Sequence, residues 1–339
     1  MTEQIEVLTT IAFEDALIEK LAAVSPRLHF RVARAAKVEE IPPEIWAMTE
    51  VLYTDRIMPA PDAVPNLHWI QFHWAGVDHA LDAPLLQKPG LVVTTLSGAA
   101  ASQVAEYIVM MLLNLGRRLP EAISLQRKES WPNDRWERFK PRELRGSTVG
   151  IVGYGSIGRQ VARLLQPFDV RILATKRHVM QPEDLGYTFD GMGDAGGYMF
   201  LRLYPPEALR SMLKECDFIV ITTPLAPHTR NLINAQTLEA VKPGAFLIDV
   251  SRGGVVDHTA LIAALKEHKL AGAALDVFPK EPLPADSPLW KMPNVILTPH
   301  IAGITTHYNE RAAVLFAENL SRYLEGLPLY NQVDLAQGY

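Results

Sequence analysis

Three side chains with acid–base and anion-binding chemistry each follow a short apolar run in the second half of the chain. Arg252 stands in Val-Ser-Arg-Gly-Gly, Glu281 in Phe-Pro-Lys-Glu-Pro, and His300 in Thr-Pro-His-Ile-Ala-Gly. If the runs are strands of one parallel sheet, their carboxyl ends line a single crevice where the three side chains would meet. The guanidinium suits a carboxylate, the imidazole can exchange a proton near neutral pH, and the glutamate can orient and charge the imidazole. A histidine after a strand is more often structural, so spacing alone leaves the triad open.

The pattern Gly153-x-Gly155-x-x-Gly158 predicts a phosphate-binding turn. An apolar run over residues 148–152 precedes it, and an amphipathic run to residue 165 follows it. The first glycine permits a tight turn, the second lets a pyrophosphate approach the backbone, and the third lets the helix pack closely on the strand. The helix N-terminus would add N–H donors for the phosphates. Between a strand and a helix, the pattern favours dinucleotide binding over an ordinary glycine-rich turn.

The end of the next predicted strand favours NADP over NAD. The chain there is Leu-Ala-Thr-Lys-Arg, with Lys176 and Arg177 where an NAD site would carry Asp or Glu for the ribose hydroxyls. Two cations would pair with a 2′-phosphate that a carboxylate would repel. A solvated basic strand end is the alternative interpretation.

Strand and helix signals alternate along the chain, which predicts parallel sheets. In the first part, strands are expected at residues 5–9, 51–53, 69–72 and 91–95, with a helix at 15–24. In the second part, strands are expected at 148–152, 170–174, 218–222, 245–250, 272–275 and 295–298, and a helix at 308–324. We also expect one long helix over 99–119, an exposed arm over 124–144 and a mobile glycine-rich loop over 184–203.

Length and charge narrow the class of protein. A chain of 339 residues suggests two domains, and a formal net charge of −5 argues against a dedicated binder of nucleic acid or anionic membranes. The single cysteine, Cys216, excludes an intramolecular disulfide and argues against a cysteine-based zinc site. The acids show no metal-ligand spacing, so no metal is expected. The N-terminus has no basic start, and the longest apolar stretch is far shorter than the roughly 20 residues of a membrane span, so we expect a cytoplasmic protein.

Four motifs occur in the order and approximate spacing of one known family. They are the segments 153–158, 251–257, 275–282 and 299–303. On these residues the chain resembles the D-isomer-specific 2-hydroxyacid dehydrogenases, and the resemblance is strong from residue 144 to 303. Several motifs in register are far more specific than any one of them.

The resemblance implies transfer of a hydride from NAD(P)H to the carbonyl carbon of a 2-oxo acid, giving the D-2-hydroxy acid. His300 would protonate the carbonyl oxygen, and Glu281 would hydrogen-bond His300 and keep it protonated. Arg252 would bind the substrate carboxylate and polarise the carbonyl. Backbone N–H groups of a loop would bind the other carboxylate oxygen; its residues are Ala75, Gly76 and Val77.

The resemblance also implies the cofactor contacts and the domain plan. The cofactor residues would be Gly153, Gly155, Ser156, Ile157, Gly158, Lys176, Arg177, Thr223, Pro224, Val250, Ser251, Asp276 and Gly303, with Asp276 at the nicotinamide carboxamide side. The fold class would be α/β with two doubly wound parallel-sheet domains. A discontinuous, flavodoxin-like substrate domain would comprise residues 1–103 and 302–339, and a Rossmann cofactor domain 104–301. Homodimers would form through the cofactor domains and the arm.

Departures from related branches narrow the substrate. Glu281 argues against formate oxidation, since that branch carries glutamine there, and Ala75 argues against phosphite oxidation, since that branch carries lysine. In lacking an acid for the ribose hydroxyls, the chain resembles the glyoxylate and hydroxypyruvate reductases of the family. The sequence therefore predicts an NADPH-preferring reductase of a small 2-oxo acid. One alternative is a dinucleotide-sensing interaction protein, similar to the co-repressor members of the family. A methyltransferase would fit the glycine-rich turn but would leave Arg252, Glu281 and His300 unexplained.

Overall fold

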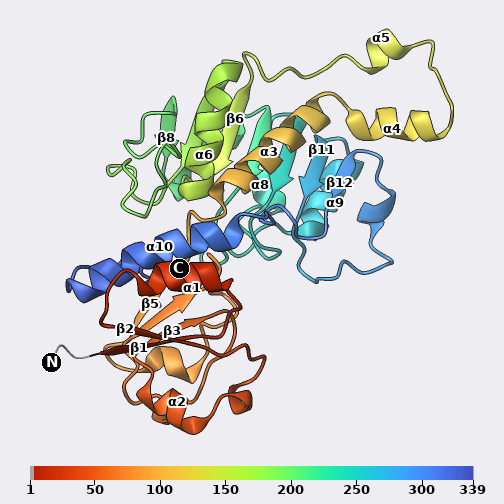
Figure 1. Ribbon diagram of the computed structural model, residues 1–339. Coiled ribbons are helices and arrows are strands. Elements are labelled where there is room, and N and C mark those ends of the chain that lie inside the picture. Colours follow the sequence, from red (N-terminus) through yellow and green to blue (C-terminus); the bar gives the residue numbers. More distant parts are fainter. Residues whose placement is uncertain (1–3, 339) are drawn as a thin grey trace. The chain divides into compact units, whose positions relative to one another are not determined.

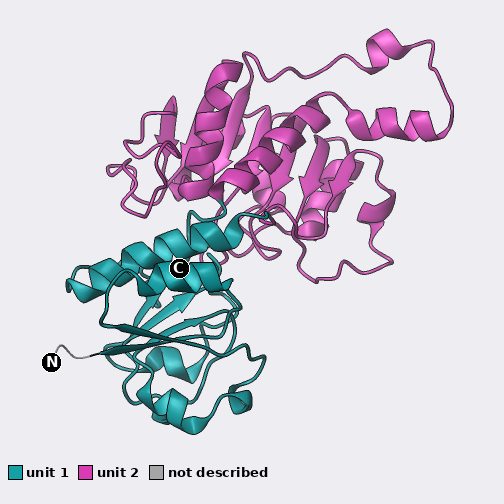
Figure 2. Ribbon diagram, in the orientation of Figure 1, with its two compact units in different colours: residues 1–100, 305–339 teal, residues 101–304 magenta. Residues whose placement is uncertain are grey.

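The computed structural model describes residues 4–338 and divides them into two compact units (Figure 2). Unit 1 takes the described residues up to Ala100 and from Thr305 onward, and unit 2 comprises Ala101–Ile304. The divisions lie close to the expected domain boundaries.

Unit 1 is built on a five-stranded parallel sheet with the strand order β2-β1-β3-β4-β5. Its strands are β1 (Ile5–Thr9), β2 (Leu28–Val32), β3 (Val51–Thr54), β4 (Trp69–Phe72) and β5 (Val92–Thr94). Its α-helices are α1 (Asp15–Ala22), α2 (Pro43–Met48) and α10 (Tyr308–Leu324); α1 and α10 lie on one face of the sheet and α2 on the other (Figure 1). The four residues of β4 are all buried, as expected of a strand covered on both faces. This is the doubly wound, flavodoxin-like strand order, and the expectation is confirmed.

Unit 2 is built on a seven-stranded parallel sheet with the order β12-β11-β10-β9-β6-β7-β8. Its strands are β6 (Thr148–Val152), β7 (Arg171–Thr175), β8 (Arg202–Tyr204), β9 (Phe218–Ile221), β10 (Ala245–Asp249), β11 (Leu270–Leu275) and β12 (Val295–Leu297). Its α-helices are α3 (Ala101–Gly116), α4 (Leu119–Arg127), α5 (Arg135–Arg138), α6 (Ser156–Leu165), α7 (Leu209–Leu213), α8 (Ala235–Glu239) and α9 (His258–Lys266). The chain order reverses between β6 and β9, which makes the carboxyl ends of these strands the ligand crevice of a Rossmann sheet. The expected Rossmann sheet is confirmed.

The expected single helix over residues 99–119 is wrong in its extent. Helix α3 ends at Gly116, and α4 begins at Leu119 after Arg118 has adopted a left-handed backbone with φ 55°. Pro120 in the first turn of α4 starts a helix readily but cannot continue one, because it has no N–H to donate. The arm expected over 124–144 contains the second half of α4 and the short helix α5.

The glycine-rich stretch is anchored rather than loosely attached, and it ends in a strand. Its last residues enter β8, which pairs with β7 at the edge of the sheet. Asp194, in the middle of the stretch, is only 4% exposed and accepts hydrogen bonds from the backbone N–H groups of Tyr198 and Met199. Composition cannot reveal such an anchor, because it depends on partners from elsewhere in unit 2. The edge strands β2 and β8 also lay outside the expected set.

Candidate active site

The glycine-rich turn connects β6 to α6 as the sequence predicts. Gly153 has φ 104°, a conformation that L side chains rarely adopt, and an added Cβ would lie 2.8 Å from Thr223 Cγ2. Gly155 is the N-cap of α6, so Ser156 and Ile157 form its first turn. A Cβ on Gly158 would lie 2.5 Å from the carbonyl oxygen of Gly153, so only glycine lets the helix approach this closely.

These residues fit a dinucleotide phosphate. The first N–H groups of α6 follow Gly155, where an added Cβ would meet no heavy atom of the described chain within 4 Å. Those donors and the helix dipole favour an anion at this position. On the neighbouring segment after β9, Thr223 Oγ1 is buried and has no hydrogen-bond partner among the residues described. Pro224 beside it is exposed.

Exchanges of two of these glycines for alanine are expected to have opposite consequences. Gly158→Ala should destabilise unit 2 by about 1–3 kcal/mol, because the new methyl group overlaps the Gly153 carbonyl. Gly155→Ala should leave stability nearly unchanged but weaken NADPH binding, because the methyl group fills the space that a pyrophosphate needs. Urea denaturation and fluorescence titration with NADPH measure the two effects. Equal losses of stability in both variants would contradict this assignment.

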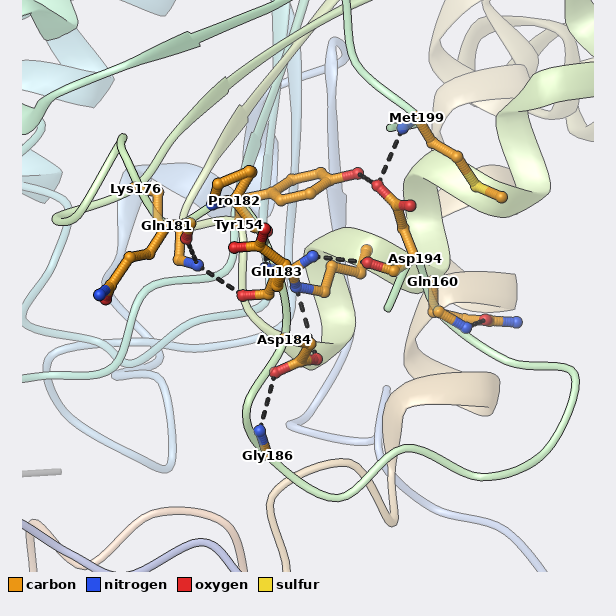
Figure 3. Close-up of polar contacts among 12 residues, drawn as sticks. Tyr154, Gln160, Lys176, Gln181, Pro182, Glu183, Asp184, Gly186, Asp194 and Met199 are labelled. Atoms are coloured by element: carbon orange, nitrogen blue, oxygen red, sulfur yellow. Dashed lines mark hydrogen bonds and ion pairs between the residues drawn. The ribbon is translucent and has the colours of Figure 1, made fainter. Parts of the chain in front are cut away.

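The two cations at the end of β7 have different surroundings. Lys176 donates to the backbone carbonyls of Gln181 and Glu183, the second at 2.8 Å, and is therefore directed into the loop that follows β7 (Figure 3). Arg177 donates from Nη2 to Nε2 of His228 at 3.0 Å. His228 lies in the segment after β9. Lys176 and Arg177 therefore do not act as one patch, because each contacts a different segment of unit 2.

The loop between β7 and β8 is fixed to the glycine-rich turn and to α6. The Tyr154 hydroxyl donates to Asp194 Oδ2 at 2.7 Å (Figure 3). Arg159 is 1% exposed and donates to the carbonyls of Asp194 and Pro182, both at 2.6 Å. Hydrogen bonds from two backbone N–H groups and from Tyr154 lower the pKa of Asp194, although burial opposes them. The buried carboxylate of Asp194, which accepts these hydrogen bonds, therefore anchors the loop to the glycine-rich turn.

Glu281 and His300 lie in hydrogen-bond contact with each other. His300 Nδ1 lies 2.8 Å from Glu281 Oε2, and Glu281 Oε1 accepts a hydrogen bond from the Phe278 backbone N–H at 3.0 Å. The side chain of His300 is 46% exposed and that of Glu281 is 37% exposed. With Nδ1 facing a carboxylate, the imidazole presents Nε2 as the atom that can exchange a proton with a substrate.

Asp276 fixes the segment that carries His300. Its Oδ1 accepts hydrogen bonds from Thr298 Oγ1 at 2.6 Å and from the Ile301 N–H at 2.9 Å, and its Oδ2 accepts from the Ala302 N–H at 2.9 Å. His300, inside this segment, has a left-handed backbone with φ 56°, which a non-glycine residue adopts only when its surroundings enforce it. Asp276 is 1% exposed. Its expected contact with the nicotinamide stays a prediction.

Arg252 follows a buried acid that the sequence analysis did not single out. Asp249, the last residue of β10, accepts hydrogen bonds at Oδ1 from the N–H (3.0 Å) and the hydroxyl (2.5 Å) of Ser251. Its Oδ2 has no hydrogen-bond partner within residues 4–338. Burial and the charge of Asp276 raise the pKa of Asp249 to about 7, against the lowering effect of the hydrogen bonds from Ser251. The sequence carries a signal for Asp249, because this acid ends an apolar strand two residues before a serine.

The Arg252 and Glu281 segments pack backbone against backbone. A Cβ on Gly253 would lie 1.9 Å from the carbonyl oxygen of Phe278, so only glycine permits this approach. The Arg252 guanidinium donates from Nη1 to the carbonyl of Ser251 at 2.8 Å. Since β10, β11 and β12 are neighbours in the sheet, the three predicted catalytic residues follow adjacent strand ends.

The remaining predicted residues occupy expected loops. Val250 and Ser251 are buried at the end of β10, and the Gly303 carbonyl accepts from Gln103 Nε2 at 3.0 Å. In unit 1, Ala75, Gly76 and Val77 follow β4; Val77 packs in that unit's core, while Ala75 is exposed.

Residues 4–338 contain neither a metal-ligand cluster nor a helix that could span a membrane. No cluster of three or more His, Cys, Asp or Glu side chains there could hold a metal ion. No helix in that part of the chain is long and apolar enough to cross a membrane.

Comparison with known proteins identifies the family. The model of the D-isomer specific 2-hydroxyacid dehydrogenase NAD-binding domain matches residues 109–302. The chain belongs to this family. A glyoxylate reductase of Thermofilum pendens is 39% identical over 278 residues, which is 81% of this chain and 77% of that protein. The resemblance stated from the motifs is therefore confirmed, and the chain is an NAD(P)-dependent D-2-hydroxyacid dehydrogenase family enzyme.

Solved structures of other members of this dehydrogenase family have the same fold. A D-isomer specific 2-hydroxyacid dehydrogenase from Xanthobacter autotrophicus, in complex with NADPH and MES, has a TM-score of 0.80 and 31% identity, with all of both chains covered. An NADPH-dependent glyoxylate/hydroxypyruvate reductase from Sinorhizobium meliloti has a TM-score of 0.74 and 25% identity, over 99% of this chain and 100% of that one. The chain spans about half the length of the D-3-phosphoglycerate dehydrogenases that it matches, for example 46% of the protein from Methanocaldococcus jannaschii.

Proposed function

We propose that this dehydrogenase reduces a small 2-oxo acid, such as glyoxylate or hydroxypyruvate, to the D-2-hydroxy acid, with NADPH as the preferred cofactor. The observation that carries the proposal is the Glu281–His300 pair. It lies on the segments next to that of Arg252, at the carboxyl edge of the sheet that also bears the glycine-rich turn. The names of the similar glyoxylate and hydroxypyruvate reductases support the substrate class.

The proton is moved by His300. The bound nicotinamide would supply a hydride to the carbonyl carbon of the substrate. His300, from Nε2, gives a proton to the carbonyl oxygen, and it takes that proton back in the direction of oxidation. Glu281, at 2.8 Å from Nδ1, holds the ring in position.

The substrate carboxylate is bound by Arg252 in this proposal. A guanidinium presents a planar fork of donors that matches a carboxylate, and its charge draws electron density from the adjacent carbonyl. We assign substrate binding in unit 1 to the backbone N–H groups at Ala75, Gly76 and Val77, and cofactor binding to unit 2. We also propose a homodimer through unit 2 and its arm, where Trp131 is 82% exposed.

NADPH preference rests on the absence of an acid at the end of β7. A carboxylate there would hydrogen-bond the ribose hydroxyls of NAD and repel a 2′-phosphate, whereas this chain carries cations. The two solved relatives described above hold NADPH or NADP, which supports the same preference.

Initial rates of NADPH and NADH oxidation test the proposal, with glyoxylate, hydroxypyruvate, pyruvate, phenylpyruvate and 2-oxoisocaproate as substrates. We expect turnover of the two smallest acids with NADPH ahead of NADH. Arg252→Ala should lower kcat/KM by about 100-fold, because a charge-assisted contact to the carboxylate is lost, while NADPH binding persists. Binding of NADPH without turnover of any acid would contradict the reductase assignment and favour a dinucleotide-sensing protein.

A further inference from the structure

The segments after β7 and β9 meet above the glycine-rich turn. Strand β6 lies between β7 and β9 in the sheet, so residues that follow the two outer strands flank the turn that follows β6. Both flanks are bonded to Gly153: its N–H donates to Thr175 Oγ1 at 3.0 Å, and its carbonyl accepts from Thr222 Oγ1 at 2.8 Å. Side chains from these segments that touch each other therefore span the dinucleotide-binding turn.

Arg177 and His228 are such a pair. Their nearest nitrogens, Nη2 and Nε2, are 3.0 Å apart, although one residue follows β7 and the other follows β9. Burial lowers the pKa of His228, and the positive charge of Arg177 lowers it further. A guanidinium beside an imidazole is electrostatically unfavourable once the imidazole is charged, and an anion between them would reverse this.

Lys176 is oriented differently. Its ammonium group donates to two backbone carbonyls of the loop after β7, those of Gln181 and Glu183 (Figure 3). Burial lowers its pKa, as does the nearby charge of Arg159, while Asp184 and Glu183 raise it. Two of its three donors are thus occupied by the loop, which Arg159 and Asp194 fix from the other side.

We propose that Arg177 and His228 together bind the 2′-phosphate of the cofactor and set its preference, whereas Lys176 is a positioning residue for the loop after β7. The proposal rests on the NADPH preference proposed above and changes which residues cause it. The sequence favoured Lys176 and Arg177 because they are adjacent in the chain, but the contacts join Arg177 to a histidine 51 positions away.

The chemistry of a phosphate monoester suits this pair. It carries between about 1.5 and 2 negative charges near neutral pH, and the guanidinium can donate two parallel hydrogen bonds to its oxygens. An imidazole next to such a dianion favours its protonated form and can then donate from Nε2. NADH offers only a hydroxyl at the same position, so the pair would discriminate between the two cofactors.

Calorimetric titration with adenosine 2′,5′-bisphosphate and with 5′-AMP separates the phosphate contact from the rest of the site. We expect the wild-type protein to bind the bisphosphate more tightly than 5′-AMP. His228→Gln should reduce this ratio about tenfold and Arg177→Gln about 100-fold, with little change for 5′-AMP. His178→Gln, an exposed histidine next to Arg177 in the chain, is the matched control and should behave as the wild type.

Lys176→Met provides the opposite arm. This exchange should weaken the binding of both nucleotides to a similar extent and leave the ratio of their affinities unchanged. Lys176→Arg should restore binding, because arginine can donate to the same carbonyls. A ratio lost in Lys176→Met but kept in His228→Gln would overturn the assignment while leaving the NADPH preference intact. Equal losses in His178→Gln would overturn it in favour of a general positive field. A wild-type protein that does not discriminate at all would instead refute the proposed NADPH preference.

Discussion

His300→Ala is expected to lower kcat/KM for 2-oxo acid reduction by about 10²- to 10⁴-fold, the usual contribution of a positioned general acid. The variant loses the only group that we place to protonate the substrate carbonyl, while the glycine-rich turn and the segment after β9 keep their structure. NADPH affinity should therefore change little. Initial rates and a fluorescence titration with NADPH measure the two quantities.

His307→Ala is the matched control for this exchange. His307 Nδ1 lies 2.8 Å from Glu310 Oε2, the same separation as in the His300–Glu281 pair, but its side chain is 62% exposed and forms an i,i+3 contact at the start of α10. Removing a surface pair of this kind costs little, so its kcat/KM should stay within about twofold of the wild-type value. Comparable losses in the two variants would exclude His300 as the acid.

Asp249→Asn is expected to change how stability depends on pH. Burial raises the pKa of Asp249 in the folded protein to about 7, from the ordinary aspartate value of 3.8. The folded protein then binds this proton more tightly than the unfolded chain does, so stability falls as pH rises between these two values. At about 1.36 kcal/mol per pKa unit, the loss amounts to roughly 4 kcal/mol by about pH 7. Asparagine is nearly isosteric and uncharged, so the variant should lack this decline.

Urea denaturation at pH 5 and pH 8 measures the effect. The difference in free energy of unfolding between Asp249→Asn and the wild type should move in favour of the variant at the higher pH. Asp257→Asn is the control: Asp257 caps α9 through the N–H groups of Thr259 and Ala260, and asparagine caps a helix equally well. Parallel stability curves for wild type and Asp249→Asn would show that Asp249 is ionised in the folded protein.

Most strands of the two sheets could be predicted from the sequence alone. Buried parallel strands are short apolar runs, and Thr148–Val152 could be recognised directly because both faces of β6 are covered. The glycine-rich turn could also be recognised in the sequence, because the backbone at Gly153 and the close packing at Gly158 require glycine. Arg252, Glu281 and His300 could be proposed as catalytic residues because each lies in the loop after a predicted strand, within a motif of the family.

The contacts that hold the segments of Arg252, Glu281 and His300 appear only in the tertiary structure. The hydrogen bonds that Asp276 accepts from the His300 segment and the packing of Gly253 on Phe278 join positions that are remote in the chain. No periodicity or local motif reports such contacts, because they depend on which strands become neighbours in the sheet. The partners of Lys176 and Arg177 show this most clearly. Two adjacent cations look equivalent in the sequence, but they leave the end of β7 toward different elements, one toward its own loop and the other toward the segment after β9.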